Sequence, residues 1–508
     1  MPSPDTDVLI VGAGPTGLML AGELGLAGVR ALVVERLAEP MRQSRALGFS
    51  ARAIEEFDQR GLLSHFGELH TLPMGHFGGL PLDYRVVPGG SYGARGKPQS
   101  LTESVLTSWA LGLGAEIRRQ HEVRALEQDA GGIRVEVTTP DGPRRITARY
   151  VAGCDGSRSA VRRLAGIDFP GTDPTVEMWF ADVTGCELRP RFAGERVPGG
   201  MVMVLPLGPA TNRVILHERG ARRTHDGAPT FDEIALMWNR LTGEDISAAT
   251  PIWTSVTSDA SRQAELYRQG RVFVLGDAAH IHLPIGAQGM SAGIGDAVNL
   301  GWKLAAVVHG RSPADLLDSY HAERHPVGAR VLVNTLAQRI LYLGGNEMDP
   351  MRAVLTELLQ YEEVRQLLVG MVTGLDIRYD MGSGEHPLLG RRLPDFELSL
   401  AAGDTVNAFS LLHAGRGVLL ELNSPSARDA AAPWGDRVDV VAVEPGAGNV
   451  LGGVGAALLR PDGYLAWTGA DDDGLADALA RWFGNPCNDA NGTVSSSRAA
   501  GARPISTT

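Results

Sequence analysis

The stretch Gly12-Ala13-Gly14-Pro15-Thr16-Gly17 decides the fold of this chain. It follows a short apolar run, Val8 to Val11, and opens an apolar, helix-like run from Pro15 to Leu26. A second apolar run, Ala31 to Val34, comes next and leads into Glu35. This order predicts a strand, a tight turn, a helix and a second, parallel strand, which together form the βαβ unit of dinucleotide-binding domains.

Each glycine of this stretch meets a physical requirement of dinucleotide binding. Gly12 permits the tight turn, Gly14 lets a pyrophosphate approach the backbone, and Gly17 lets the helix pack on the strand. The helix N-terminus then faces the phosphates, and Glu35 is expected to bind the ribose hydroxyls of the adenosine. The fingerprint alone does not separate FAD from NAD.

Two further motifs point to a flavin. Cys154-Asp155-Gly156 follows a buried strand pattern and opens a helix, and Gly276-Asp277 ends another strand pattern that begins at Arg271. An Asp at a strand end can accept a hydrogen bond from a ribitol hydroxyl. The glycine-rich loop after it begins a helix at about Gly289, whose N-terminus would direct backbone N–H groups at the N1/O2 edge of the flavin.

In this order and spacing, the three motifs resemble those of the para-hydroxybenzoate hydroxylase-like FAD monooxygenases. The chain is most similar to the actinomycete aromatic polyketide hydroxylases of antibiotic biosynthesis, particularly angucycline oxygenases. The resemblance implies that NAD(P)H reduces a non-covalent FAD, with NADPH favoured by the family. O₂ then adds to give a C4a-hydroperoxyflavin, which hydroxylates a polycyclic, angucyclinone-type substrate. The stretches that carry the resemblance are Ser44-Arg45-Ala46-Leu47-Gly48-Phe49, Phe57-Asp58-Gln59-Arg60-Gly61, Gly75-His76-Phe77-Gly78-Gly79-Leu80-Pro81 and Ala279-His280-Ile281-His282-Leu283-Pro284.

The motifs and the resemblance together give the expected cofactor-binding residues. The resemblance places Arg36 by the adenosine, Arg45 at the pyrophosphate and Gln99 against FAD. Ala287 and Ser291 depart from the family pattern, which usually has Gly and Asn there. No catalytic base is assigned, because the substrate phenol or the peroxyflavin could supply the proton chemistry. The complete set is Gly12, Ala13, Gly14, Pro15, Thr16, Gly17, Glu35, Arg36, Arg45, Gln99, Asp155, Gly276, Asp277, Pro284, Gly289, Met290 and Ser291.

Some single residues have more than one interpretation. His280 and His282 flank the flavin loop, but without a clustered acidic partner such residues are more often structural than bases or metal ligands. Met201, Met203 and Leu205 alternate like one face of a strand, and could line an apolar substrate cavity or belong to the core. A small benzoate would need a buried cationic clamp, for which Arg213 stays an open candidate.

The predicted fold class is α/β, with a Rossmann-like FAD-binding domain in two parts, residues 1–170 and 266–385. Residues 171–265 are expected to form a substrate-binding β-sheet domain. Residues 394–484 resemble the thioredoxin-like domain of phenol hydroxylase relatives; they contain no cysteine, so disulfide exchange is excluded. Residues 485–508 are expected to be a disordered tail. Helical spacing further predicts helices over 51–63, 326–342 and 362–374.

The composition excludes several classes of protein. The chain has 508 residues and a net charge of −12, which argues against a general nucleic-acid binder. Its three cysteines, Cys154, Cys186 and Cys487, form no CxxC pair, so no disulfide framework or cysteine metal site is expected. With no signal-peptide pattern and no apolar run that could span a bilayer, the expectation is a cytoplasmic protein without a membrane partner. A homodimer stays open.

Other functions compete with the monooxygenase hypothesis. One is a plain NAD-dependent dehydrogenase on a Rossmann domain, which the Gly276-Asp277 motif disfavours. Another is a flavin-binding protein without catalysis. Within the enzyme class, Baeyer–Villiger oxygenation or an oxidation coupled to dehydration of the same substrate class stays open.

Overall fold

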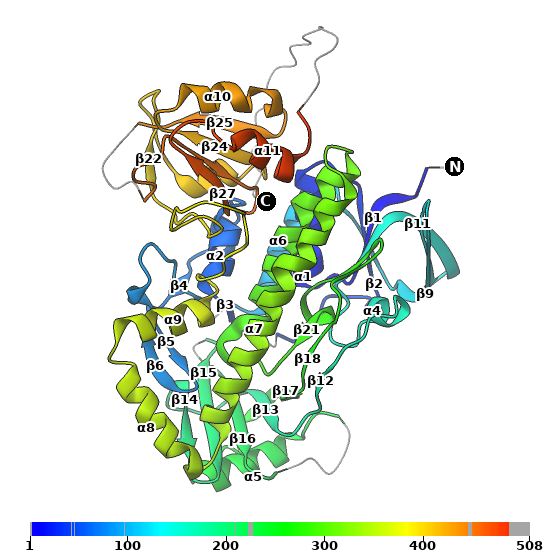
Figure 1. Ribbon diagram of the computed structural model, residues 1–508. Coiled ribbons are helices and arrows are strands. Elements are labelled where there is room, and N and C mark those ends of the chain that lie inside the picture. The colour runs from blue at the N-terminus through cyan, green and yellow to red at the C-terminus, as the bar shows by residue number, and fades with distance from the viewer. Residues whose placement is uncertain are drawn as a thin grey trace.

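The computed structural model describes residues 3–41, 43–44, 46–95, 97–208, 210–221, 227–444 and 450–486. Figure 1 shows a parallel sheet with its helices in the middle, an antiparallel sheet on one side and a smaller C-terminal sheet on the other. Arg45 and the predicted tail beyond Pro486 lie outside the described residues.

The central strands of the parallel sheet, β1, β2 and β20, are short, apolar and almost wholly buried, as this sheet type requires. Helix α1 (Pro15–Leu26) crosses from β1 to β2, which pair in parallel with Val8 opposite Ala31. The predicted βαβ unit is therefore confirmed. The parallel strands follow the order β20, β11, β1, β2 and β8, with bounds Val272–Val274, Gly142–Gly153, Thr6–Val11, Ala31–Glu35 and Glu116–Arg119.

Three long helices flank this sheet: α3 (Gln99–Gly112), α6 (Gln288–Val308) and α7 (Asp318–Leu343). A hairpin turn at Asp141-Gly142 joins β10 (Gly132–Thr139) to β11. The minor elements are α4 (Ala160–Leu164), β3 (Gly48–Phe49), β4 (His70–Thr71), β5 (Met74–Phe77), β6 (Leu80–Asp83), β7 (Ala94–Arg95), β9 (Glu122–Asp129), β12 (Gly171–Thr172), β18 (Ser261–Gln263), β19 (Arg268–Gln269), β21 (His280–Ile281), β22 (Glu397–Ser399) and β23 (Thr405–Asn407).

Two predicted helix bounds are wrong, for local reasons. The helix expected over 51–63 ends at Asp58 (α2, Ala51–Asp58), because Gly61 adopts a positive φ of 68° and turns the chain. The helix expected to begin at Pro326 begins at Asp318 and continues through that proline. Helix α9 (Glu362–Thr373) is confirmed, whereas α8 (Asp349–Leu358) was not expected.

The second sheet is antiparallel throughout. Helix α5 (Phe231–Thr242) covers one face; a capping box formed by Thr230 and Glu233 starts it, and Gly243 in the left-handed region ends it. Trp238 of α5 is fully buried against the sheet. The strand order is β14, β15, β16, β13 and β17, with bounds Arg191–Val197, Gly200–Pro206, Thr211–Glu218, Glu177–Thr184 and Thr250–Ser258.

The C-terminal region folds as a four-stranded sheet with α10 (Pro425–Ala431) and α11 (Leu475–Phe483) packed on it. Residues Leu459 to Tyr464 form the turn of the hairpin between β26 and β27. The strand order is β25, β24, β26 and β27, with bounds Val438–Ala442, Gly417–Glu421, Ala456–Leu459 and Leu465–Gly469.

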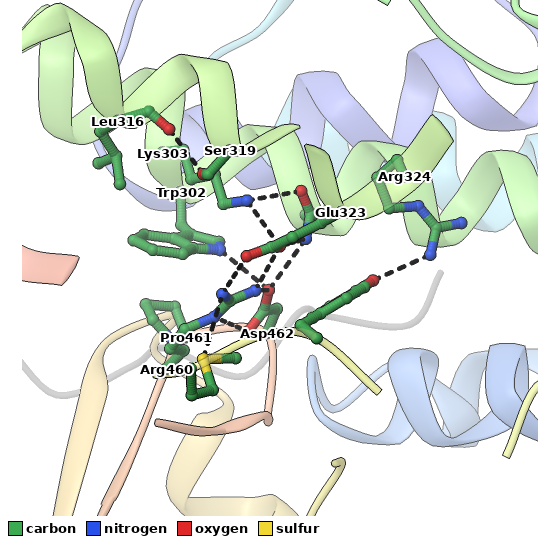
Figure 2. A network of polar contacts seen from close by, with 12 residues as sticks. Trp302, Lys303, Leu316, Ser319, Glu323, Arg324, Arg460, Pro461 and Asp462 are labelled. Atoms are coloured by element: carbon green, nitrogen blue, oxygen red, sulfur yellow. Dashed lines mark hydrogen bonds and ion pairs between the residues drawn. The ribbon is translucent and has the colours of Figure 1, made fainter. Parts of the chain in front are cut away.

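Buried charges join this C-terminal sheet to the rest of the chain (Figure 2). Arg460 is fully buried in the β26–β27 turn, and its guanidinium donates to Glu323 of α7 at 2.6 and 2.9 Å. Glu323 also accepts from Lys303 of α6 at 2.8 Å, and Asp462 pairs with Arg460 from the same turn. Charges buried this deeply are costly unless paired, and here the pairs connect the C-terminal sheet to α6 and α7.

Lys303 gives this network a pH dependence. Burial lowers its pKa from 10.5 to about 8. Between these two pH values the unfolded chain holds a proton that the folded chain has lost, so folding stability rises with pH. We expect the free energy of unfolding of the wild type, relative to Lys303→Met, to increase by about 3 kcal/mol from pH 8 to pH 10.5 in urea titrations. A difference independent of pH would contradict this expectation.

No helix among the described residues is long and apolar enough to cross a membrane.

Candidate active site

The three motifs meet at one edge of the parallel sheet. They follow β1, β11 and β20, which are neighbours, and the carboxyl ends of parallel strands share an edge. A Cβ atom added to Gly12 would lie 2.3 Å from the carbonyl oxygen of Cys154. One added to Gly276 would lie 2.6 Å from Oγ1 of Thr16. The first motif therefore touches both of the others.

The glycine-rich loop fits a dinucleotide pyrophosphate. Gly12 has a φ of 107°, which favours glycine, and its amide donates to the Val34 carbonyl at 2.8 Å. Gly14 precedes α1 without a side-chain cap, and the first turn of α1 contains no acidic residue. A Cβ atom on Gly14 would meet no described protein atom within 4 Å. Open space in front of uncapped backbone N–H groups is the environment that phosphate oxygens prefer.

Two carboxylates accept hydrogen bonds from backbone amides at this edge of the parallel sheet. Glu35 accepts hydrogen bonds from the amides of Ala13 and Leu37, each at 2.9 Å, so it fixes the glycine-rich loop directly. In Asp155, Oδ2 accepts from the amides of Ala160 and Val161 at 2.6 and 3.1 Å. Its Oδ1 is buried without a partner among the described residues, and burial raises the pKa of this carboxyl. A buried polar atom of this kind is where a missing partner is expected.

The third motif leads into the N-terminus of α6. Asp277 is exposed after β20, and Pro284 is exposed in the loop that follows. Ala287, the residue before α6, lies in the left-handed region with a φ of 56° and makes no side-chain cap. This backbone conformation explains why glycine suits the position, and alanine there costs about 1 kcal/mol. Ser291 Oγ accepts from the amide of Ser50 at 3.0 Å, which ties α6 to α2.

The two histidines of this loop have structural environments. His280 is buried, and its Nε2 contacts Asp296 Oδ2 at 2.8 Å. The premise that no acidic partner exists was therefore wrong. Burial alone would raise the pKa of Asp296, but Arg324 and His280 lower it to about 2. Asp296 also accepts from the Gly276 amide at 3.0 Å, so it supports the turn. Burial lowers the pKa of His282 to about 4.

Asp296 is the main site residue that the sequence reasoning missed. Its signal was a lone carboxylate in a strongly apolar helix, Ile294-Gly295-Asp296-Ala297. Such a residue is almost never fully buried unless it is paired. No group of three or more potential metal ligands was found among the described residues.

One face of the antiparallel sheet is turned toward the loop that precedes α6. Met178, Phe180, Met201 and Ile215 of this face form one cluster with Leu283 and Ile285 of the loop. Met201 is fully buried and belongs to the core. Met203, Leu205 and Trp253 are only partly buried at the edge of the cluster, so this is where apolar surface stays accessible.

Arg213 lies on the same face but is already paired. It is 1 % exposed, and its Nε and Nη2 donate to the two oxygens of Asp182 at 2.6 and 2.8 Å. The indole N–H of Trp253 donates to Asp182 at 2.7 Å. A guanidinium held in this way is not available as a clamp for a substrate carboxylate.

The remaining predicted site residues that the structure describes lie directly after β2, at the start of α3 and in the first turn of α6. Arg36 is exposed directly after β2. Gln99 begins α3, and its Nε2 donates to Glu103 at 2.8 Å. Gly289 and Met290 are in the first turn of α6. Arg45 lies outside the described residues.

A glycine-rich dinucleotide site at the edge of a parallel sheet, with a second helix N-terminus and an apolar sheet face beside it, is the arrangement expected of a dinucleotide-dependent oxidoreductase, and it suits a flavin. The family comparisons agree. Residues 5–335 match the model described as "FAD binding domain", and residues 386–486 match "Aromatic-ring hydroxylase, C-terminal". The chain belongs to this family of FAD-dependent aromatic-ring hydroxylases.

Known relatives cover nearly the whole chain. The 12-dehydrotetracycline 5-monooxygenase/anhydrotetracycline 6-monooxygenase of Streptomyces rimosus is 46% identical over 94% of this chain and 99% of its own length. CabE, described as an aromatic hydroxylase from angucycline biosynthesis, is 53% identical with a TM-score of 0.91, over 96% and 100% of the two chains. AlpK is 61% identical with a TM-score of 0.89, over the same shares.

The protein is accordingly an FAD-dependent monooxygenase of aromatic compounds, and NADPH is the reductant typical of its family. The resemblance inferred from the three motifs is confirmed. The alternative hypothesis of a plain NAD-dependent dehydrogenase is therefore rejected.

Proposed function

We propose that this enzyme hydroxylates a polycyclic aromatic polyketide of the angucyclinone type, with O₂ as the oxygen donor. The observation that carries the proposal is the sheet face opposite the flavin loop. Its partly accessible residues include Met203, Leu205 and Trp253, and its buried arginine is paired with Asp182. Flat apolar rings gain affinity from burial against such a surface, whereas a small benzoate would need a free cation. The relatives named for tetracycline and angucycline hydroxylation support the same substrate class.

The proposed FAD site is built on the glycine-rich loop from Gly12 to Gly17. The pyrophosphate would lie over Gly14 at the N-terminus of α1, and Glu35 would hold both the loop and the adenosine ribose. Asp277 is assigned to the ribitol chain. Gly289, Met290 and Ser291, in the first turn of α6, would face the pyrimidine edge of the flavin. Bound there, FAD supplies hydride acceptance from NADPH and activation of O₂.

The protein's own contribution is to position and to exclude water. Pro284 and the first turn of α6 would set the plane of the ring system. The apolar sheet face would orient the substrate carbon that is attacked and keep water away from the reaction. No side chain is assigned as a general base.

We further propose that residues 394–484 form a thioredoxin-like domain with a structural role. The parallel pair β24 and β25, extended by the antiparallel strands β26 and β27, supports the comparison. The segment has no cysteine for redox chemistry, and the buried Arg460 docks it on α7.

The test of the proposed function is product analysis under ¹⁸O₂. With NADPH and a prejadomycin-like tetracyclic phenol, we expect NADPH oxidation coupled to a product that carries one labelled oxygen on an intact ring. A ring-expanded labelled lactone would indicate Baeyer–Villiger oxygenation instead, and additional loss of water would indicate coupled dehydration. Para-hydroxybenzoate should give mostly H₂O₂. The reverse preference would overturn the polyketide assignment and leave the monooxygenase assignment intact.

A further inference from the structure

A cavity of about 360 Å³, lined by both apolar and charged residues, lies beside α6, among α2, α7 and α9. It runs from the exposed residues Arg330 and Asp380 to Glu56, Gln288 and Ser291, which are buried. Helix α6 therefore has two different sides. Ser291, Ala292 and Gly295 line the cavity, whereas a Cβ atom on Gly293 would meet Thr16 of the cofactor motif at 2.4 Å.

Buried polar atoms on the cavity wall lack protein partners. Glu56 and Gln288 are each 4 % exposed. Within the described part of the chain, Oε2 of Glu56 and Nε2 of Gln288 have no hydrogen-bond partner. Buried polar atoms are almost always satisfied, and the cavity is large enough for the water molecules that would bind these two atoms. Water in the cavity would thus connect the carboxyl group of Glu56 with solvent.

Glu56 is surrounded by charges of both signs. Arg52 and Glu55 lie on its own helix, Arg324 approaches from α7, and Glu23 from α1. Burial raises the pKa of Glu56 to about 7, against the opposing effect of Arg52 and Arg324. The carboxylate also touches α6, because a Cβ atom on Gly295 would lie 3.2 Å from its Oε1.

The chemistry of the family requires a proton from solvent. The balance RH + NADPH + H⁺ + O₂ → ROH + NADP⁺ + H₂O consumes one proton per turnover. The hydride of NADPH supplies two electrons, one oxygen atom forms the new C–O bond, and the other leaves as water with the proton. A reaction site that excludes bulk water therefore needs a separate route for this proton.

We propose that the cavity is the proton-entry route of the enzyme and that Glu56 is the side chain that takes up the proton. The proposal rests on the proposed position of the flavin at the N-terminus of α6. Gly295 lies seven residues into α6 from Gln288, about 10 Å along the axis. At this distance, a negative charge on a flavin at the N-terminus of α6 would raise the proton affinity of Glu56 about tenfold. Ser291, in the first turn of α6, lines the inner end of the cavity, next to the proposed flavin position.

Proton uptake can be counted during anaerobic reduction of the holoenzyme by NADPH. Hydride transfer from NADPH to FAD gives an anionic reduced flavin and takes up no proton by itself. A proton that disappears therefore reports either a protein group or N1 of the reduced flavin, and the part that is lost in Glu56→Gln reports Glu56. An indicator dye in weakly buffered solution measures it from pH 6 to pH 8, the range that brackets the Glu56 pKa of about 7. We expect the wild type to take up a fraction of a proton per FAD, with a maximum about half a pH unit above the Glu56 pKa of about 7, because the uptake is greatest midway between the pKa values before and after reduction. Glu56→Gln should take up at least threefold less, while its FAD is still bleached by NADPH.

Asp380→Asn is the matched control, because it removes a carboxylate at the exposed mouth and leaves Glu56 in place. Its uptake should equal that of the wild type. In the oxidised wild-type holoenzyme, the ¹³C-carboxyl signal of Glu56 should titrate near neutral pH, which tests the proposal even if Glu56→Gln does not fold. Unchanged uptake in a folded Glu56→Gln variant, or a Glu56 signal that does not titrate between pH 6 and pH 8, would overturn the proposal. If NADPH did not reduce the FAD of the wild-type enzyme, the proposed function itself would be refuted.

Discussion

Replacing Gly14 by alanine is expected to abolish FAD retention while the protein still folds. A Cβ atom at this position meets no described protein atom within 4 Å, so the folded chain accommodates it. The same atom would occupy the space in which the proposed pyrophosphate approaches the backbone at the N-terminus of α1. We expect the affinity for FAD to fall at least 100-fold, measured by the flavin fluorescence released on dilution. Urea unfolding of the apoprotein should stay within about 0.5 kcal/mol of the wild type.

Gly12→Ala is the informative partner of this variant. Its Cβ atom would lie 2.3 Å from the Cys154 carbonyl oxygen, and its φ of 107° disfavours any other residue. This change should therefore destabilise the apoprotein itself, by about 3 kcal/mol or more. If Gly14→Ala unfolds the protein as Gly12→Ala does, or if it retains FAD normally, the assignment of the pyrophosphate to Gly14 is wrong.

Asp182→Ala is expected to destabilise the antiparallel sheet strongly. The substitution leaves the guanidinium of Arg213 buried without its carboxylate and the indole N–H of Trp253 without its acceptor. Removing one member of a buried ion pair costs about 3–5 kcal/mol. The loss should appear as a lower urea midpoint with an unchanged slope, because the surface exposed on unfolding is the same.

The double variant Asp182→Ala/Arg213→Met distinguishes pairing from packing. Without either charge, the sheet should recover at least half of the stability lost, because methionine fills the space without an unpaired cation. Tetracyclic phenols should also bind this variant when flavin absorbance changes are titrated. If Arg213→Met alone abolished substrate binding without loss of stability, Arg213 would be a substrate clamp after all.

The part of the fold that depends on local rules could be predicted from the sequence. The turn at Gly12 and the helix start at Pro15 are set by neighbouring residues, and so is the alternation in β10. The same rules located the strand ends at which the motifs meet. Glu35 illustrates the limit. It was placed correctly at the end of β2, but its bonds to the amides of Ala13 and Leu37 depend on the folded loop.

Features that depend on distant partners could not be predicted in this way. Glu323 and Arg460 are 137 positions apart, and nothing in their neighbourhoods indicates that they pair. The start of α7 was misplaced because proline usually begins or interrupts a helix. Tertiary contacts override that rule here, since Tyr320 in the preceding turn donates to the Val274 carbonyl at 2.9 Å. Helix α8 was missed because Pro350 was not recognised as a first-turn residue.

The length of α7 has a mechanical consequence. The helix carries Glu323, bound to Arg460, toward one end, and at the other Tyr342 and Leu343 pack against the apolar sheet face (Figure 1). These two points are about 28 Å apart along one continuous helix. A small tilt of the C-terminal sheet would be transmitted along this helix. It would displace the apolar sheet face against which the substrate is expected to bind. Exchange of C-terminal segments between related enzymes would then alter regioselectivity from a distance, without a single change among the residues that touch the substrate.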